Sequence, residues 1–284
     1  MSRTKGLVEI DHFGLDYISE GQATEAVADV SISVRPGEFV SIVGPSGCGK
    51  STLLNAVAGF RAPTRGRVRV DGEVVRGPGA DRGMVFQQYS LFPWKTVRQN
   101  VEFGLKMKGV GVDERERMAR TLLALAGLIG FEDQYPDRLS GGMKQRVGIV
   151  RALATGPKVL LLDEPFGALD AQTRVIMQQI LTNIWQRLRI SVLFVTHDID
   201  EAIFLSDRVY VMTARPGRLK AEFAVTLPRP RDPDGMLEPG FLALRRELAG
   251  LIREESLRAM GGELTGGLDG LDVMLGDGSL ADVL

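Results

Sequence analysis

The sequence predicts an α/β fold built around a parallel sheet, and three observations carry this prediction. Short continuous apolar runs occur at residues 39–43, 159–162 and 191–195, and such runs are typical of parallel strands buried on both faces. A helical pattern, "VIMQQILTNIWQRLR", separates the second run from the third. A glycine-rich segment, "GPSGCGKST", connects the first run to another helical pattern. Together these patterns favour strands joined by crossover helices.

The other elements follow from local signals along the chain. Strands are expected in "LVEI" and "VADVSISV" near the start, and Asp71-Gly72 indicates a hairpin turn. Residues from about Pro93 to Thr155 have a mainly helical pattern, interrupted by glycine and proline. Two further strands are expected on either side of Pro216-Gly217. We therefore place the main domain at residues 7–230, with a helical insertion at about 93–155.

The C-terminal stretch, residues 231–284, has a different composition and is treated as an extension. "LPRPRDPDGMLEPG" is rich in proline and charge, which is typical of a linker. "FLALRRELAGLIREESLRAM" predicts an amphipathic helix that ends at Met260. The remaining residues are rich in glycine, aspartate and leucine, and we expect a flexible tail, with a small docking segment as the alternative.

Composition and charge exclude several classes of protein. The 284 residues carry 35 basic and 36 acidic side chains, a net charge of -1 that gives no reason to expect a duplex nucleic-acid partner. The lone Cys48 excludes an intrachain disulfide and suits a reducing compartment. No run reaches the roughly 18 apolar residues of a spanning helix, and the N-terminus lacks a secretory pattern. We expect a cytoplasmic protein whose membrane role, if any, comes through a partner.

The glycine-rich segment has the features of a phosphate-binding loop. It fits the pattern G-x-x-x-x-G-K-[ST] and stands between an apolar strand and a helix, as that motif requires. Glycines let backbone N–H groups close around phosphate oxygens at a helix N-terminus. The Lys50 ammonium is expected at the β- and γ-phosphates, and the Ser51 hydroxyl on Mg²⁺. The residues assigned to this loop are Gly44, Pro45, Ser46, Gly47, Cys48, Gly49, Lys50, Ser51 and Thr52.

Polar residues follow the other apolar strands. Asp163 and Glu164 come after the run at 159–162, and His197 comes after the run at 191–195. Ligands bind beyond the carboxyl ends of strands in an open α/β sheet, so all three side chains should lie near the loop. We assign Asp163 to Mg²⁺ through water, Glu164 to the general base, and His197 to the γ-phosphate and the attacking water. Gln87, after "GMVF", is assigned to Mg²⁺ or to the attacking water.

The stretch "LSGGMKQRV" indicates a second anion site. Ser140, Gly141 and Gly142 precede a helical pattern, so a hydroxyl and bare N–H groups stand at a helix N-terminus. This site has no lysine of its own, and the residues alone do not say why one chain would need two anion sites.

These motifs resemble the ATP-binding subunits of ABC transporters, over roughly residues 7–230. The P-loop, the Q-loop glutamine, the signature "LSGGM", the Walker B strand "VLLLDEP", the D-loop "GALD" and the switch segment "VTHD" occur in the usual order. Tyr17 matches the aromatic residue on which adenine stacks, and Asp170 matches the D-loop aspartate at the dimer interface. Met143 departs from the glutamine of many members. The resemblance implies a P-loop NTPase core with an antiparallel β subdomain and an inserted α-helical subdomain.

The resemblance also implies why two anion sites exist. In this family two cassettes pair head to tail, and the signature loop of each closes on the ATP held by the other's P-loop. Ser140, Gly141 and Gly142 would then serve the partner's nucleotide. The resemblance leaves open whether the second cassette is another copy of this chain or a related one.

The resemblance implies an ATPase that powers a membrane importer, with a permease and, indirectly, a substrate-binding protein as partners. "MVFQQYSLFPWKTV", "DEPFGALDAQTR" and "LPRPRD" are similar to the nitrate, sulfonate and taurine uptake group. The expected location is the cytoplasmic face of the membrane. A soluble ABC-type ATPase and a separate-chain exporter or lipid-trafficking ATPase are the alternatives. The apolar side chains of "QYSLFPW" have two interpretations: packing within the helical subdomain, or a groove, with Trp94, that receives a permease helix.

Overall fold

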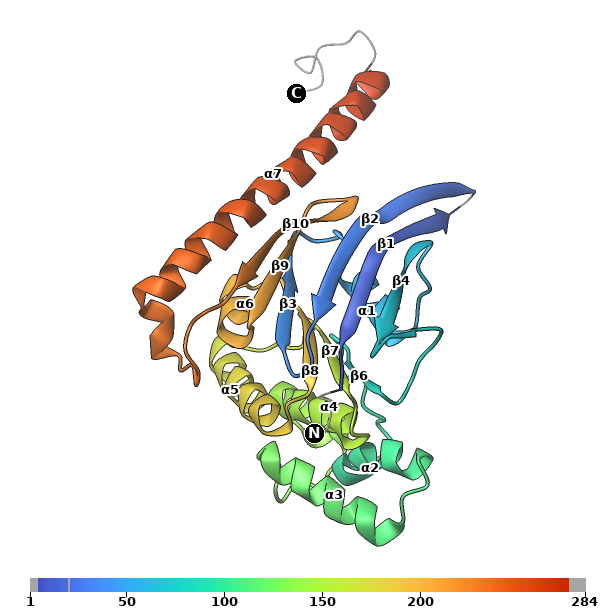
Figure 1. Cartoon of the computed structure of the whole chain (residues 1–284), viewed down its shortest axis with the longest axis vertical. Helices are drawn as coiled ribbons and strands as arrows, with labels where there is room; N and C mark the ends of the chain where they lie inside the picture. Colours follow the sequence, from blue (N-terminus) through green and yellow to red (C-terminus); the bar gives the residue numbers. More distant parts are fainter. Residues whose placement is uncertain (1–4, 20, 276–284) are drawn as a thin grey trace.

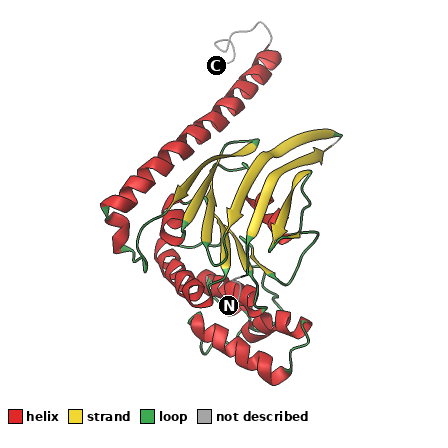
Figure 2. Ribbon diagram, in the orientation of Figure 1, coloured by secondary structure: helices red, strands yellow, loops and turns green. Residues whose placement is uncertain are grey.

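The computed structural model describes residues 5–19 and 21–275, and it has one ten-stranded sheet with helices around it (Figures 1 and 2). The strand order is β5-β4-β1-β2-β10-β9-β3-β8-β7-β6. The strands are β1 (Val8–Ser19), β2 (Gln22–Val34), β3 (Phe39–Val43), β4 (Arg65–Val70), β5 (Glu73–Val74), β6 (Arg82–Val85), β7 (Val159–Asp163), β8 (Ser191–Val195), β9 (Arg208–Met212) and β10 (Gly217–Ala224).

The sheet has a parallel part and a largely antiparallel part. Strands β9, β3, β8, β7 and β6 run parallel to their neighbours. β5, β4, β1 and β2 pair antiparallel, and β10 joins the two parts by pairing antiparallel with β9 and parallel with β2. The predicted α/β class is therefore confirmed, as is the hairpin at Asp71-Gly72.

The parallel strands are buried on both faces, which explains their continuous apolar runs. In β3, Val40 and Ile42 face a core shared with the antiparallel strands and the helix α1 (Lys50–Ala58). Phe39 and Val43 face a second core on the other side, formed with α5 (Ala171–Leu188) and α6 (Ile199–Leu205). A strand with an apolar core on each side has no polar face, so its sequence shows no alternation.

The helical insertion lies between β6 and β7. It contains α2 (Val97–Met107), α3 (Val112–Leu125) and α4 (Gly141–Ala154), which enclose a third apolar core. The first helix begins at Val97 instead of near Pro93, because Thr96 caps it: Thr96 accepts from Gln99 N–H, and Gln99 Oε1 accepts from Thr96 N–H. Figure 1 shows α2 and α3 at one end of the molecule, with α4 between them and the sheet.

Strand β1 differs from the expectation. "LVEI" predicted a short strand, whereas β1 continues to Ser19, and the residue Tyr17 belongs to it. His12 has a positive φ of 47°, and the pairing with β2 shifts register between Ile10 and Phe13. A bulge breaks the two-residue alternation, and the sequence pattern therefore underestimates the length of this strand.

The C-terminal helix α7 (Pro239–Leu275) also differs from the expectation. The predicted amphipathic helix is present, but it continues through the glycine-rich stretch beyond Met260 to Leu275. The rest of the expected tail, residues 276–284, lies outside the described residues. Figure 1 shows α7 as a long helix that passes β10 and extends away from the sheet. No helix within residues 5–19 and 21–275 has the length and apolarity needed to cross a membrane.

Candidate functional site

The glycine-rich loop joins β3 to α1, and its backbone conformation requires glycine. Gly47 and Gly49 have φ values of 73° and 97°, in the left-handed region that other residues rarely adopt. A Cβ at Gly49 would also overlap the Val27 side chain. The backbone conformation therefore disfavours side chains at both positions, and close packing also excludes one at Gly49. The backbone N–H groups of the loop stay available for an anion.

The Lys50 side chain folds back across this loop. Its ammonium donates to Gly44 O at 2.8 Å and to Pro45 O at 2.9 Å, and the residue is 6% exposed. Two carbonyl contacts hold the ammonium in place without neutralising its charge. The arrangement therefore presents a fixed positive charge at the loop.

Ser51 and Asp163 meet at the carboxyl edge of the parallel sheet. The Ser51 hydroxyl donates to Asp163 Oδ1 at 2.8 Å, although the two residues are 112 positions apart. Asp163 is the last residue of β7, next to β8 and one strand further from β3. Burial raises the pKa of the Asp163 carboxyl, and the hydrogen bond from Ser51 opposes that shift. A hydroxyl and a carboxylate side by side are oxygen donors of the kind that Mg²⁺ prefers.

The Glu164 carboxylate contacts two polar side chains from other segments of the chain. His197 Nδ1 lies 3.1 Å from Glu164 Oε2, and Gln87 Nε2 donates to the same oxygen at 3.4 Å. Glu164 has a φ of 43°, unusual for a residue with a side chain, and its N–H donates to Val195 O at 2.9 Å. Positive φ at such a residue stores strain, which the neighbouring strand β8 maintains through this hydrogen bond.

Lys50, Ser51, Gln87 and Glu164 line one polar cavity of about 470 Å³, whereas Asp163 and His197 are not among its lining residues. Tyr17 reaches it from β1, and the Tyr17 hydroxyl lies 3.0 Å from Thr52 Oγ1. Arg61 stacks on the Tyr17 ring at 5.1 Å from its centroid. The lining residues are Tyr17, Ala26, Ser46, Gly47, Gly49, Lys50, Ser51, Thr52, Gln87, Glu164 and Arg215. Its size and polar lining suit a phosphorylated small molecule.

The second predicted anion site lies at the start of α4. Ser140 caps this helix by accepting from Met143 N–H at 3.4 Å. A Cβ at Gly141 would crowd the Tyr89 hydroxyl, and one at Gly142 would crowd the Thr173 side chain. Asp170 caps α5 in the same way, by accepting from Thr173 N–H at 2.9 Å, and this bond lowers the pKa of its carboxyl. None of Ser140, Gly141, Gly142 and Asp170 lines the polar cavity, as far as the structure describes it.

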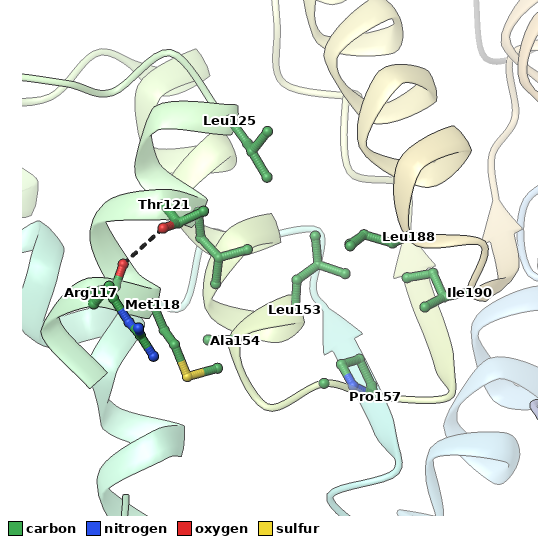
Figure 3. Close-up of a pocket in the computed structure, with 11 residues that line it drawn as sticks. Arg117, Met118, Thr121, Leu125, Leu153, Ala154, Pro157, Leu188 and Ile190 are labelled. Atoms are coloured by element: carbon green, nitrogen blue, oxygen red, sulfur yellow. Dashed lines mark hydrogen bonds between the residues drawn. The ribbon is translucent and has the colours of Figure 1, made fainter. Parts of the chain in front are cut away.

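A different cavity, of about 440 Å³, has the opposite chemistry (Figure 3). It lies where α3 and the end of α4 face the end of α5 and the start of β8. Its lining is mostly apolar, as Leu125, Leu153, Leu188 and Ile190 illustrate. It has no glycine-rich loop and no carboxylate, so the polar cavity remains the site for a phosphorylated ligand.

Known proteins are similar to this chain in both sequence and fold. The family described as "ABC transporter" matches residues 27–167. Nitrate import ATP-binding protein NrtD of Synechocystis sp. is 50% identical over 252 residues, which cover 87% of this chain and 95% of that protein. Taurine import ATP-binding protein TauB of Rhizobium johnstonii is 46% identical over 260 residues, which cover 89% and 99%. The chain belongs to the ABC transporter family. It is an ATP-binding subunit and an ATPase.

A solved structure confirms the fold of this ABC cassette. The dimeric post-hydrolysis state of the ATP-binding cassette MJ0796, bound to ADP and Pi, superposes with a TM-score of 0.69 at 34% identity. The match covers 78% of this chain and 100% of that one. The polar cavity of this ABC ATPase is therefore its candidate ATP site.

Sequence reasoning missed two cationic residues of the ABC cassette. Arg61 follows α1, and Arg215 stands in the turn between β9 and β10. The pattern of "TARPGR" indicates only a turn between two strands. Its proximity to the loop depends on β9 pairing with β3, which places the end of β9 beside the end of β3. The sequence pattern carries no signal for that pairing.

Proposed function

We infer that this ABC ATPase is the energy-coupling subunit of an importer for a small anion such as nitrate, a sulfonate or taurine. The observation that carries the catalytic part is the grouping of Gln87, His197 and Glu164 at the carboxyl edge of the sheet, beside Ser51 and Asp163. Support for the cargo class comes from the relatives, whose names specify nitrate and taurine import.

In the proposed site, the loop residues 44–52 hold the phosphates of ATP, and the Lys50 ammonium contacts the outer ones. The Tyr17 ring, which lines the same cavity, stacks on adenine. Glu164 accepts a proton from the attacking water, and His197 donates to the γ-phosphate. The contact between His197 and Glu164 supports this assignment, because it places the two side chains next to each other at the carboxyl edge of the sheet.

The residues near Ser51 fit a magnesium ion. The Ser51 hydroxyl, the Asp163 carboxylate and the Gln87 amide oxygen are hard oxygen donors. In the proposal Ser51 binds Mg²⁺ directly, Gln87 binds it or orients the water, and Asp163 acts through a water. The ion would neutralise charge on the phosphates.

We place Ser140, Gly141, Gly142 and Asp170 at a head-to-tail interface with a second cassette, most simply another copy of this chain. Support comes from their position outside the polar cavity and from the exposed Ser140 hydroxyl at a helix N-terminus. The solved relative is described as dimeric. Each ATP would then lie between the P-loop of one copy and the signature loop of the other.

The membrane partner is proposed to bind at the segment after Gln87. Trp94 is 70% exposed, and its ring packs on Phe92, whose own ring lies 4.7 Å from Phe103. Phe60 and Phe86 stack at 6.1 Å, and both are exposed. Exposed aromatic residues this close to a nucleotide contact favour the groove interpretation over core packing for Trp94. A permease helix bound there would hold the ATPase at the cytoplasmic face of the membrane.

The experiment is transport by the assembled complex. The chain would be tagged, isolated with its permease from membranes of its own host, and reconstituted in vesicles with ATP enclosed or outside. Labelled nitrate and taurine would be followed with the matching binding protein present. ATP on the cassette side should drive uptake toward that side for at least one anion.

Two results would contradict the proposal. ATP-driven movement in the opposite direction would identify a separate-chain exporter. A tagged chain found only with soluble complexes, with full ATPase activity and no permease, would identify a soluble ABC-type ATPase. The Glu164→Gln complex serves as the matched control, because it should assemble but not transport.

A further inference from the structure

The turn between β9 and β10, residues 213–216, packs directly on the phosphate-binding loop. A Cβ at Gly217 would overlap Cys48 O, and a Cβ at Gly44 would lie 2.9 Å from Met212 O. The phosphate-binding loop therefore contacts the chain at both ends of this turn. The side chain of Arg215 projects from this turn at the edge of the ATP cavity.

Arg215 lines the polar cavity together with Ser46 and Gly47. Its Nη2 atom lies 3.9 Å from the position of a Cβ built on Gly47. The side chain is exposed, and no carboxylate or hydrogen-bond acceptor within residues 5–19 and 21–275 engages its guanidinium. A guanidinium without a protein partner, beside a loop that cradles phosphate, has the geometry and charge to bind phosphate oxygens.

Arg218, in the same hairpin, provides a contrast. It is also exposed, and it lines a neighbouring cavity of about 620 Å³ between the hairpin and α7. It does not line the ATP cavity. Both arginines add the same charge to this region, and both line the neighbouring cavity together with Ser46 and Gly47, but only Arg215 also lines the ATP cavity.

The long helix α7, which passes β10 in Figure 1, contacts the turn through a side-chain hydrogen bond. Glu255 of α7 is 2% exposed, and its Oε2 accepts from Ala214 N–H at 2.9 Å, one residue before Arg215. Its other oxygen, Oε1, pairs with Lys220 of β10 at 2.6 Å and with Arg258 at 3.0 Å. A buried carboxylate with three donors restricts the turn, and this restriction limits where Arg215 can point.

We propose that Arg215 binds the phosphates of the nucleotide and that Glu255 of α7 positions it. This inference rests on the proposed placement of ATP in the P-loop. The C-terminal extension thereby becomes part of the nucleotide site, because Glu255 of α7 binds the turn that carries Arg215. Arg215 is a binding residue and Glu255 a positioning residue.

The test compares Arg215→Gln with the matched control Arg218→Gln in the full-length chain. Arg215→Gln should raise KM for ATP on the order of tenfold with kcat changed less than about twofold, because a charge-assisted contact is lost while the catalytic groups remain. Arg215→Lys should recover part of the loss. Arg218→Gln should resemble the wild type. Arg215→Gln should raise the Kd for AMP less than the Kd for ATP, because AMP lacks the outer phosphates.

Glu255→Gln tests the positioning role. It should raise KM by less than Arg215→Gln does, and the double variant should be no weaker than Arg215→Gln alone. Thermal unfolding of each variant would show whether the fold is retained. Unchanged KM in Arg215→Gln, equal losses for ATP and AMP, or additive losses in the double variant would each overturn the inference.

Lys50→Ala separates this inference from the proposed ATP site. If Lys50→Ala leaves ATP affinity unchanged, the placement of ATP in the loop is wrong. If Lys50→Ala abolishes binding while Arg215→Gln has the KM of the wild type, the ATP site stands and only the role of Arg215 is overturned.

Discussion

Glu164 is held in a conformation that a side-chain-bearing residue rarely adopts, directly after β7 and with two polar side chains on one of its oxygens. Strain at such a position costs on the order of 1–3 kcal/mol, and the surrounding core must compensate for it. That cost is consistent with the carboxylate being placed for chemistry.

Replacing this carboxylate should separate ATP binding from hydrolysis. Glu164→Gln keeps the shape and the hydrogen-bonding oxygen but removes the base. We expect turnover to fall below about a tenth of wild type, with Kd for ATP nearly unchanged. Phosphate release and nucleotide titration would measure the two quantities. Glu73→Gln, exposed on β5, is the control, and turnover above a tenth would contradict the role of Glu164 as the base.

The thiol of Cys48 lies inside the P-loop and is fully buried. Burial raises the pKa of the Cys48 thiol, although the nearby Lys50 ammonium opposes this. Because the thiolate is the reactive form, alkylation at pH 7 should be much slower than for the unfolded chain and should accelerate as the pH rises toward the raised pKa. MgATP should slow it further, and the modified protein should lose ATP binding.

Intact mass measured against time of iodoacetamide exposure would test this. The urea-unfolded chain sets the reference rate. A folded chain that reacts as fast as the unfolded one, or an alkylated chain with full ATPase activity, would show that the loop differs from the structure described.

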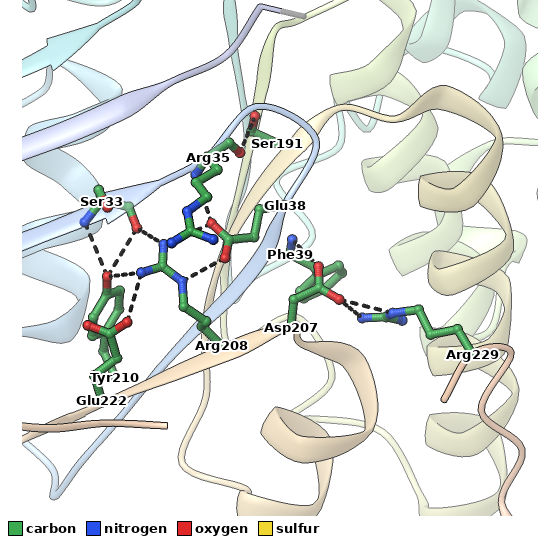
Figure 4. A network of polar contacts seen from close by, with 10 residues as sticks. All are labelled: Ser33, Arg35, Glu38, Phe39, Ser191, Asp207, Arg208, Tyr210, Glu222 and Arg229. Atoms are coloured by element: carbon green, nitrogen blue, oxygen red, sulfur yellow. Dashed lines mark hydrogen bonds and ion pairs between the residues drawn. The ribbon is translucent and has the colours of Figure 1, made fainter. Parts of the chain in front are cut away.

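Among the elements, the junction of β2, β3 and β9 depends on Arg208 (Figure 4). Its guanidinium donates to both oxygens of Glu38, at 2.6 and 2.8 Å, and also to Glu222 and to Ser33 O. The hydrogen bonds to Glu38 raise the pKa of Arg208. These contacts connect the antiparallel strands to the parallel sheet at the end of β9 opposite the ATP cavity.

Removing one partner of this buried pair should destabilise the fold. Glu38→Gln removes the negative charge that faces the buried Arg208 guanidinium. We therefore expect the free energy of unfolding to fall by about 3 kcal/mol. Urea unfolding would measure it. The control is Asp29→Asn, whose exposed contact with His12 should contribute less than about 1 kcal/mol. A loss for Glu38→Gln as small as that of the control would refute the structural role of the pair.

The segment between β6 and α2 connects Gln87 to the exposed ring of Trp94. Trp94→Ala should spare the ATPase activity and the melting temperature of the isolated chain, because this side chain is 70% exposed. It should weaken assembly with the permease, measured by the yield of complex from membranes. Loss of folding would instead support the core-packing interpretation, and Met107→Ala, at an exposed position on α2, is the matched control.

At the scale of the whole molecule, the two anion sites predict a dimer that depends on ATP. The Glu164→Gln variant should be monomeric without nucleotide and dimeric with MgATP, because ATP bridges the P-loop and the partner's signature loop while hydrolysis is blocked. Light scattering after size exclusion would measure the mass. Ser140→Ala in the same background should weaken the dimer, and a variant that binds ATP yet stays monomeric would contradict a homodimer in the absence of the permease.

Local chemistry determined much of this protein from its sequence alone. The P-loop is contiguous in the chain, β7 and β8 are joined by the single helix α5, and each buried strand has its own continuous apolar run, so local patterns predicted them. Asp163, Glu164 and His197 could be placed near the loop because parallel strands end at one edge of a sheet.

Contacts between distant segments were decided only by the tertiary structure. Nothing local in "TARPGR" indicates that Arg215 lies beside Gly47, since that contact depends on β9 pairing with β3 and on Glu255 reaching Ala214 from α7. The length of β1 likewise depends on a register shift and on pairing with β2, which override local propensity. The side-chain pattern of a segment indicates which of its faces is buried. Which distant segment packs on that face is determined by the fold as a whole.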